Sequence, residues 1–182
     1  MARVYLSVGS NLGDRLQSLR VAIEQLRALQ EVAFVAASPL YQTEPWEQVP
    51  GQPPDPQHWY FNCVVVIETS LAPATLLEQL QSIEGALGRV RGPGTHEDRR
   101  YEPRPLDIDI LLYGDQVISA SEDLHVPHLL MHERAFVLRP LADLAPDLEH
   151  PILYQTIAQL LASLEDAHQV RRLDQPARWF DS

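Results

Sequence analysis

The sequence has no lysine, one cysteine, few basic residues and no long hydrophobic run, and the last three features each exclude a class of protein. All 14 basic residues are arginines, and 25 acidic residues bring the formal net charge to −11. This charge argues against nucleic acid as a partner, because neutralising phosphates needs a basic surface. Cys63 alone cannot form an intrachain disulfide or a multi-cysteine zinc site, which favours a reducing, cytoplasmic location. No apolar run approaches the roughly 20 residues that cross a bilayer, so we expect no membrane partner.

The remaining composition is that of one folded domain. Of the 182 residues, 45% are hydrophobic and 21% are charged. This apolar fraction is too high for a disordered chain, and the length suffices to bury a core. We expect a single domain over residues 1–182, with the informative motifs in about 4–146, an extension over 150–182, and a monomeric state.

Hydrophobic periodicity predicts alternating strands and helices. The predicted strands cover residues 3–8, 32–40, 60–67 and 107–113, and the predicted helices cover 12–26, 73–88 and 154–164. The first six elements follow the order β-α-β-β-α-β, which is that of the ferredoxin-like α+β sandwich with an antiparallel sheet. The last helix is then a C-terminal helical extension. Residues 48–58 and 89–105 are expected to be loops, and the last dozen residues are expected to be loosely held.

Two carboxylates stand close together on the last predicted strand of this sandwich. Asp107 and Asp109 are two residues apart and therefore share one face, while Ile108, Ile110 and Leu112 are expected on the opposite, apolar face. Such carboxylates repel each other unless a cation lies between them. Oxygen ligands alone favour Mg²⁺ over zinc. An exposed strand with two solvated acids would explain the spacing equally well.

Arginines are concentrated just before these acids. Five lie within 16 positions, namely Arg89, Arg91, Arg99, Arg100 and Arg104. Carboxylate-bound Mg²⁺ together with guanidinium groups is the combination that phosphoryl transfer needs. A solvated, charge-rich loop is the alternative. The sequence has no Walker-type glycine loop and no protein-kinase motif set, so the common nucleotide-binding frameworks are absent.

A second group of residues is aromatic with embedded polar side chains. Tyr60 and Asn62 share a face of their predicted strand, and Thr43, Trp46 and Phe136 lie in or beside loops. An asparagine in an aromatic slot offers both a donor and an acceptor, which suits a flat heterocycle such as a pterin or a purine. The aromatic residues could equally be ordinary core residues.

Three histidines lie close together after the last predicted strand. His125, His128 and His132 have no cysteines beside them and do not lie on a predicted His-x-x-x-His helix. They are therefore expected to form hydrogen bonds rather than to bind a metal.

Three motifs, in this order, give the sequence a specific resemblance. They are Gly-Ser-Asn-Leu-Gly at 9–13, Arg-Pro-Leu-Asp-Ile-Asp-Ile-Leu at 104–111, and Val-Pro-His at 126–128 with Arg-Ala-Phe-Val-Leu at 134–138. Together they resemble the 6-hydroxymethyl-7,8-dihydropterin pyrophosphokinase family of folate biosynthesis. The resemblance implies a ferredoxin-like enzyme that transfers diphosphate from MgATP to the pterin hydroxymethyl group and releases AMP.

The resemblance also implies roles for individual residues. Asp107 and Asp109 would bind two Mg²⁺ ions and would act in catalysis with Arg89 and Arg104. Contacts to ATP would come from Glu84, Arg89, Arg91, Arg104, Ile110, His128 and Arg134. The pterin would be bound by Gly9, Thr43, Pro45, Trp46, Tyr60, Asn62, Tyr101 and Phe136.

Two other functions use parts of the same pattern. A different Mg²⁺-dependent phosphohydrolase or nuclease could use the acidic pair, but it would not need the heterocycle slot. A non-catalytic ligand-sensing module of the same fold would bind nucleotide or pterin without turnover, even after loss of the acids.

Overall fold

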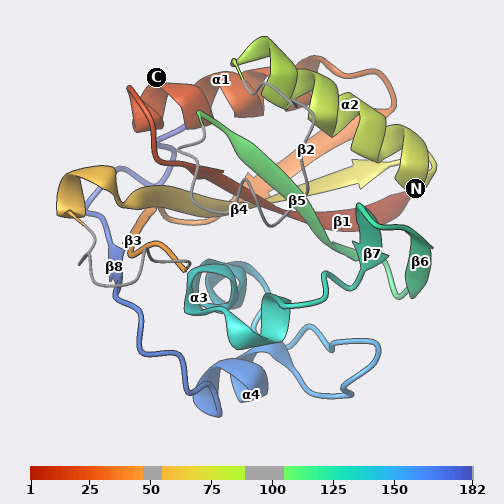
Figure 1. Ribbon diagram of the computed structural model, residues 1–182. Coiled ribbons are helices and arrows are strands. Elements are labelled where there is room, and N and C mark those ends of the chain that lie inside the picture. Colours follow the sequence, from red (N-terminus) through yellow and green to blue (C-terminus); the bar gives the residue numbers. More distant parts are fainter. Residues whose placement is uncertain (47–54, 89–104, 182) are drawn as a thin grey trace.

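The computed structural model describes residues 1–46, 55–88 and 105–181 (Figure 1). Its main sheet has six antiparallel strands in the order β5-β1-β4-β3-β8, and β2 pairs with β4 as well. These strands are β1 (Ala2–Ser10), β2 (Val32–Ala37), β3 (Tyr41–Thr43), β4 (Tyr60–Thr69), β5 (Asp107–Tyr113) and β8 (Val170–Arg172). A separate hairpin is formed by β6 (Ile118–Ser121) and β7 (Leu124–Val126). None of the helices in these described ranges has the length and apolar composition of a membrane span.

The predicted β-α-β-β-α-β order is confirmed by β1, α1 (Arg15–Ala28), β2, β4, α2 (Pro73–Ala86) and β5. Proline occupies the first turn of α2, where its missing N–H breaks no helical bond. Gly88 follows the helix with a φ of 95°, a backbone conformation that favours glycine. Leu12, however, is exposed and precedes α1, so the apolar stripe of that helix begins later than predicted.

The two faces of the sheet are covered by different helices (Figure 1). On one face, side chains such as Leu6 and Val65 pack against the apolar stripes of α1 and α2. On the other face, Tyr5, Val64 and Val66 pack against α3 (Ala135–Leu144) and α4 (Ile157–Ala162). Successive side chains of a strand point to opposite faces, which explains why neighbours in β1 and β4 belong to different clusters.

Strand β5 departs from regular alternation. Leu6 pairs with Ile110 and Tyr5 pairs with Leu112, so Leu111 is an extra residue in the ladder, as in a β-bulge. Ile108 and Ile110 pack toward α1 and α2 as predicted, but Leu112 packs on the α3 side together with Leu111. The prediction for Leu112 was wrong because the bulge reverses the alternation after Ile110.

Several elements were missed or misplaced. Helix α3, strand β3 and the β6–β7 hairpin were not predicted, and the strand predicted at 32–40 ends at Ala37 as β2. Helix α4 is shorter than the helix predicted at 154–164, with Ile157 and Leu160 buried.

The expectation that the last dozen residues are loosely held was wrong. Strand β8 pairs with β3, Trp179 and Phe180 belong to the core, and the Trp179 indole N–H donates to the Ser38 carbonyl oxygen at 2.9 Å. The end of the chain thus completes both the sheet and the core.

Candidate functional site

One row of paired residues crosses four strands on the α3 side of the sheet. Asp107 of β5 pairs with Gly9 of β1, Gly9 pairs with Asn62 of β4, and Asn62 pairs with Tyr41 of β3. Because adjacent strands lie about 4.8 Å apart, Asp107 and Asn62 are separated by roughly 10 Å. Gly9 has no side chain, and the Asn62 side chain lies over its backbone.

The amide end of this row is fixed by close contacts. Asn62 is 4% exposed, and its Nδ2 donates to the Thr43 hydroxyl oxygen at 2.5 Å. A Cβ atom added to Gly9 would lie 2.3 Å from Asn62 Oδ1, which is far inside van der Waals contact. Glycine at position 9 is therefore what lets the Asn62 amide lie against β1. The predicted residues Gly9, Thr43 and Asn62 are brought together by the fold.

The acidic end lies on the edge strand. Asp107 and Asp109 are half-buried and, as predicted, share one face, with Ile108 buried on the other. The Ile108 amide between them donates to the Glu84 carboxylate at 2.8 Å, and Glu84 is 1% exposed. This bond ties α2 to the edge of the sheet beside the two acids. The Ile110 side chain packs in the α1/α2 core, so only its main chain could contact a nucleotide on the acidic face.

His128 lies beside the acidic end. It follows the cis Val126–Pro127 bond, and its backbone N–H donates to the Leu111 carbonyl oxygen at 2.9 Å. Burial, reinforced by the positive charge of Arg134, lowers the pKa of His128 to about 4, although Asp107 opposes the shift. The ring is thus neutral at pH 7. Because Nδ1 accepts from the Leu130 amide at 3.3 Å, the proton is on Nε2, which can donate to a ligand.

The predicted hydrogen-bonding role of these histidines is confirmed for His125 as well. Its Nδ1 lies 3.2 Å from the Ser119 hydroxyl oxygen. His132 lies 3.5 Å from a carboxylate oxygen of Glu133.

Trp46 and Phe136 form an aromatic wall on the α3 side of the sheet. The rings of Trp46 and Phe136 meet edge to face with centroids 6.4 Å apart. The guanidinium carbon of Arg134 lies 5.6 Å from each ring centroid. Pro45, next to Trp46, and Tyr60, at the start of β4, are half-buried. Arg134, predicted for ATP, therefore contacts two residues predicted for the pterin.

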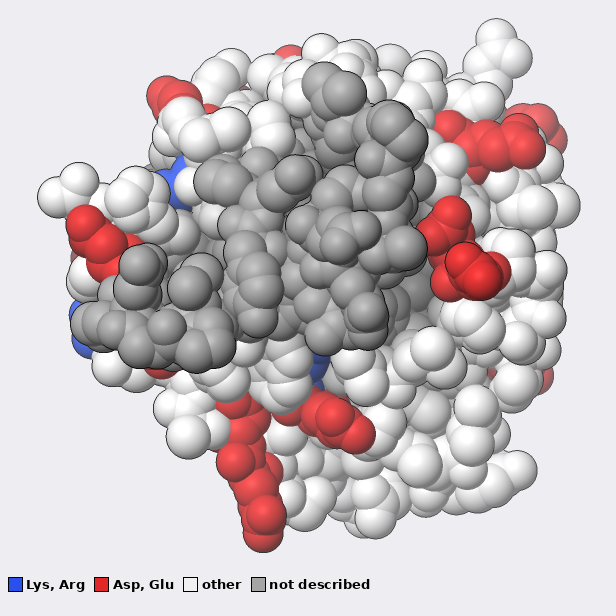
Figure 2. Space-filling view, viewed as in Figure 1, with Lys and Arg blue, Asp and Glu red and all other residues white. Residues whose placement is uncertain are grey.

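Four predicted site residues lie outside the described ranges, namely Arg89, Arg91, Tyr101 and Arg104. Within those ranges, no three His, Cys, Asp or Glu side chains gather into a metal-binding group. Carboxylate side chains are visible at several places on the face shown in Figure 2, in keeping with the acidic net charge.

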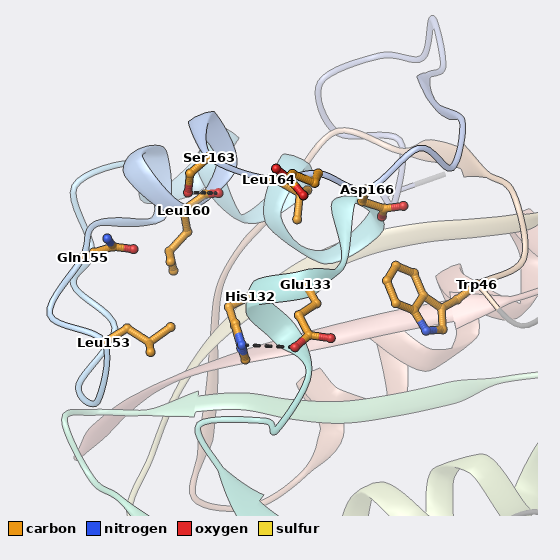
Figure 3. A pocket seen from close by; sticks show the side chains of 10 residues that line it. Trp46, His132, Glu133, Leu153, Gln155, Leu160, Ser163, Leu164 and Asp166 are labelled. Atoms are coloured by element: carbon orange, nitrogen blue, oxygen red, sulfur yellow. Dashed lines mark hydrogen bonds and ion pairs between the residues drawn. The ribbon is translucent and has the colours of Figure 1, made fainter.

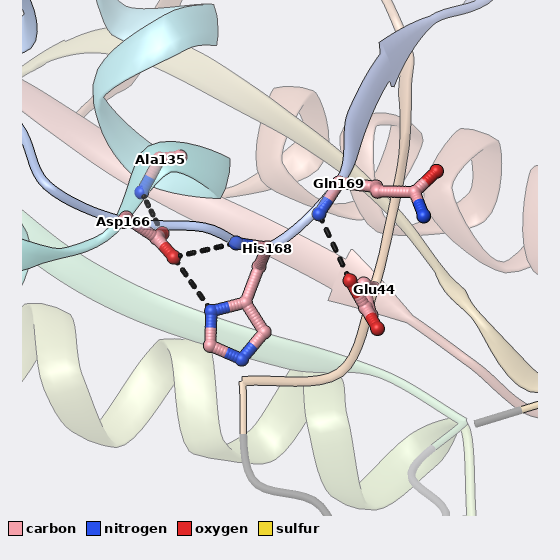
Figure 4. Close-up of polar contacts among 5 residues, drawn as sticks. All are labelled: Glu44, Ala135, Asp166, His168 and Gln169. Atoms are coloured by element: carbon pink, nitrogen blue, oxygen red, sulfur yellow. Dashed lines mark hydrogen bonds and ion pairs between the residues drawn. The ribbon is translucent and has the colours of Figure 1, made fainter. Parts of the chain in front are cut away.

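Two residues of the C-terminal extension reach the aromatic wall, and sequence reasoning missed both. The His168 ring lies against Trp46 with centroids 4.9 Å apart, and His168 Nδ1 lies 2.6 Å from Asp166 (Figure 4). Asp166 also accepts the Ala135 amide at the start of α3. Nothing in the local sequence signals these contacts, because they depend on the chain returning past β3.

A hollow of about 540 Å³ borders Trp46 beside α4 (Figure 3). It is lined by Trp46, His132, Glu133, Leu153, Gln155, Leu160, Ser163, Leu164, Glu165 and Asp166. It does not include Asp107, Asp109 or Asn62, so it is separate from the row described above.

Comparison with known proteins gives consistent matches in sequence. Residues 5–146 match the family described as 7,8-dihydro-6-hydroxymethylpterin-pyrophosphokinase. A Methylorubrum extorquens protein named 2-amino-4-hydroxy-6-hydroxymethyldihydropteridine pyrophosphokinase is 44% identical over 165 residues, covering 91% of this chain and 95% of that protein. A Pseudomonas aeruginosa protein of the same name is 45% identical over 149 residues, covering 82% and 84%.

Solved structures show the same fold at low identity. A crystal structure of an HPPK-DHPS in complex with substrates is similar with a TM-score of 0.64 at 15% identity over 89% of this chain. The Plasmodium falciparum HPPK-DHPS with pterin and p-hydroxybenzoate gives a TM-score of 0.64 at 17% identity over 88%. The matched part is 44% and 41% of those longer chains, so this chain spans less than half of each.

Proposed function

We propose that this chain, which belongs to the 7,8-dihydro-6-hydroxymethylpterin-pyrophosphokinase family, transfers diphosphate from ATP to the hydroxymethyl group of 6-hydroxymethyl-7,8-dihydropterin, a step of folate biosynthesis. The products are AMP and the pterin diphosphate. The observation that carries the proposal is the row across the sheet. Asp107 and the buried Asn62 amide lie about 10 Å apart in this row with Gly9 between them, and Asp109 lies two residues from Asp107 on the same face.

The amide end is suited to bind the pterin. The Asn62 side chain has a donor and an acceptor for the edge of the ring, and its orientation is fixed by Thr43. Tyr60, Trp46 and Phe136 are the aromatic residues available to contact the ring faces. Tyr101 and Pro45 complete the set that we assign to the pterin.

The acidic end is suited to magnesium. Asp107 and Asp109 are half-buried carboxylates on one face, and they form an all-oxygen donor set whose mutual repulsion a cation would relieve. We propose that they hold two Mg²⁺ ions, which would neutralise phosphate charge beside them. Glu84 accepts the backbone amide of Ile108, which lies between the two acids. His128 offers its Nε2–H to the nucleotide.

We assign two contributions to the protein: it orients the pterin hydroxyl group toward ATP, and it neutralises charge on the phosphates. The pterin hydroxyl oxygen attacks the β-phosphorus of ATP and loses its proton, and the bond from that phosphorus to the α,β-bridging oxygen breaks to release AMP. The row supports a pose in which a pterin bound at Asn62 has its hydroxymethyl group toward the acids. Arg89, Arg91, Arg104 and Arg134 neutralise charge on the phosphates, and no general base is assigned.

The test is a product analysis. We expect incubation with ATP, Mg²⁺ and 6-hydroxymethyl-7,8-dihydropterin to give AMP and the pterin diphosphate in equal amounts. ADP with orthophosphate would instead indicate a phosphohydrolase. Binding of both ligands without turnover would indicate a sensing module. A cytosolic location and a monomeric state stay predictions from the sequence.

A further inference from the structure

The C-terminal extension meets the candidate site along the segment from Glu165 to Val170. β8 begins at Val170, which pairs with Thr43. The Glu44 amide donates to the Gln169 carbonyl oxygen at 2.9 Å, and the Gln169 amide donates to the Glu44 carboxylate at 3.0 Å. The segment therefore follows the chain that leads from Thr43 to Trp46 (Figure 4).

The Asp166 carboxylate joins this segment to α3. One oxygen accepts the Ala135 amide at 2.7 Å, at the first residue of α3 and next to Phe136. The other oxygen accepts the His168 backbone amide at 2.9 Å and lies 2.6 Å from His168 Nδ1. Burial alone would raise the pKa of Asp166, but the two amides and the His168 ring lower it below its ordinary value. Asp166 is thus ionised at pH 7 and keeps both contacts.

The His168 ring carries the connection to Trp46. Its centroid lies 4.9 Å from that of Trp46, with the ring planes inclined by 34°. Trp46 in turn meets Phe136 edge to face. A closed set of contacts therefore runs from α3 through Asp166 and His168 to Trp46 and back to Phe136. The two aromatic residues that we assign to the pterin come from segments 90 positions apart in sequence, and Asp166 and His168 bridge them.

We propose that Asp166 and His168 are positioning residues that set the spacing between Trp46 and Phe136 for pterin binding. The inference rests on the proposed function, because it names what the extension does for that same site. Asp166 fixes the start of α3 and the His168 ring, and His168 supports the Trp46 ring. Neither residue touches the reacting atoms, so their loss acts on pterin affinity and leaves the chemistry at the acidic end intact.

The test compares Asp166→Ala, His168→Ala and His168→Phe with Gln169→Ala. The control is matched, because the Gln169 side chain lies in the same segment and bonds only Arg171 among the contacts described. We expect the KM for the pterin to rise about tenfold in D166A and H168A, with kcat and the KM for ATP within about twofold of wild type. H168F keeps a ring against Trp46 and should recover most of the pterin affinity, whereas Q169A should match wild type.

A second readout does not depend on turnover. Trp59 and Trp179 are 3% and 1% exposed, so acrylamide quenching of fluorescence reports mainly on half-buried Trp46. Quenching should increase in H168A but not in H168F or Q169A, at temperatures where thermal melts show every variant folded. Unchanged pterin KM and unchanged quenching in folded H168A would overturn the inference. Absence of AMP formation by the wild-type protein would instead overturn the proposed function, and pterin affinity by equilibrium dialysis would still test the role of His168.

Discussion

The two ends of the row across the sheet are held by different means. At the amide end, Asn62 is held by Thr43 and lies against the bare backbone of Gly9, and an aromatic wall that the C-terminal extension supports lies on the same side of the sheet. At the acidic end, Asp107 and Asp109 are half-buried on an edge strand that is tied to α2 through Glu84. The amide end is therefore suited to recognise the shape of a ligand, and the acidic end is suited to bind positive charge. Changes at the first should act on pterin affinity, and changes at the second on turnover.

Removing one carboxylate should produce the largest effect. Asp109→Ala should lower kcat at least about 1,000-fold, because phosphate charge that builds up in the transition state loses its neutralising cation. The melting temperature should change little, since loss of one acid also relieves repulsion by Asp107. Asp115→Ala, an exposed acid in the turn after β5, is the control and should leave kcat unchanged. Normal turnover by D109A would contradict the assignment of the acidic end.

Adding one methyl group at Gly9 should act at the opposite end. In Gly9→Ala the new Cβ would meet Asn62 Oδ1 at 2.3 Å, so the amide must rotate away from its place beside Thr43. We expect pterin affinity to fall about 100-fold and the free energy of unfolding to fall by about 1–3 kcal/mol. Calorimetric titration and urea unfolding measure the two effects. Gly85→Ala on the exposed face of α2, where a Cβ meets nothing within 4 Å, should keep wild-type affinity.

Much of the framework of both ends could be predicted from local sequence. The spacing of Asp107 and Asp109 fixes their common face, the apolar run at 60–67 indicates a central strand, and Pro73 marks a helix start. The element order then suffices to propose the antiparallel sandwich. These signals are local, since each depends on side chains a few positions apart.

The missed features depend on contacts between distant segments. The bulge at Leu111 is hidden because Leu111 and Leu112 are both apolar and suit either face. Helix α3 is short and contains Pro140, which weakens its helical signal. Trp179 and Phe180 are buried although polar residues surround them in sequence, because β8 returns the chain to the sheet. The register that aligns Asp107, Gly9 and Asn62 is likewise set by packing across strands and by turns.

Acid should lower the free energy of unfolding, in part through His128 beside the acidic end. The pKa of His128 is about 4 in the folded protein, below the ordinary value of 6.5, so the unfolded chain takes up a proton first as the pH falls. The stabilisation is complete above pH 6.5 and is lost as the pH falls toward 4, by about 2–3 kcal/mol. Burial lowers the pKa of His150 as well, which adds to the loss. Urea unfolding at pH 7 and pH 4.5 should show a smaller difference in His128→Gln than in wild type, whereas His58→Gln, at an exposed position, should retain the full difference.

The finest distinction concerns a single hydroxyl at the amide end. Thr43→Val removes the acceptor of the Asn62 Nδ2–H with almost no change of shape, and a buried donor left unpaired costs about 1–3 kcal/mol. We expect the pterin KM to rise about tenfold while the KM for ATP stays within about twofold. Thr69→Val is the matched control. Thr69, like Thr43, is a buried threonine with a hydrogen-bonded hydroxyl, which donates to the Glu31 carbonyl oxygen at 2.7 Å, but it lies at the end of β4 away from Asn62. If both variants lose a similar amount of stability but only T43V loses pterin affinity, the loss of affinity comes from the orientation of Asn62 and not from the stability of the sheet. Equal pterin KM values in the two variants would show that the Thr43 contact does not orient the amide.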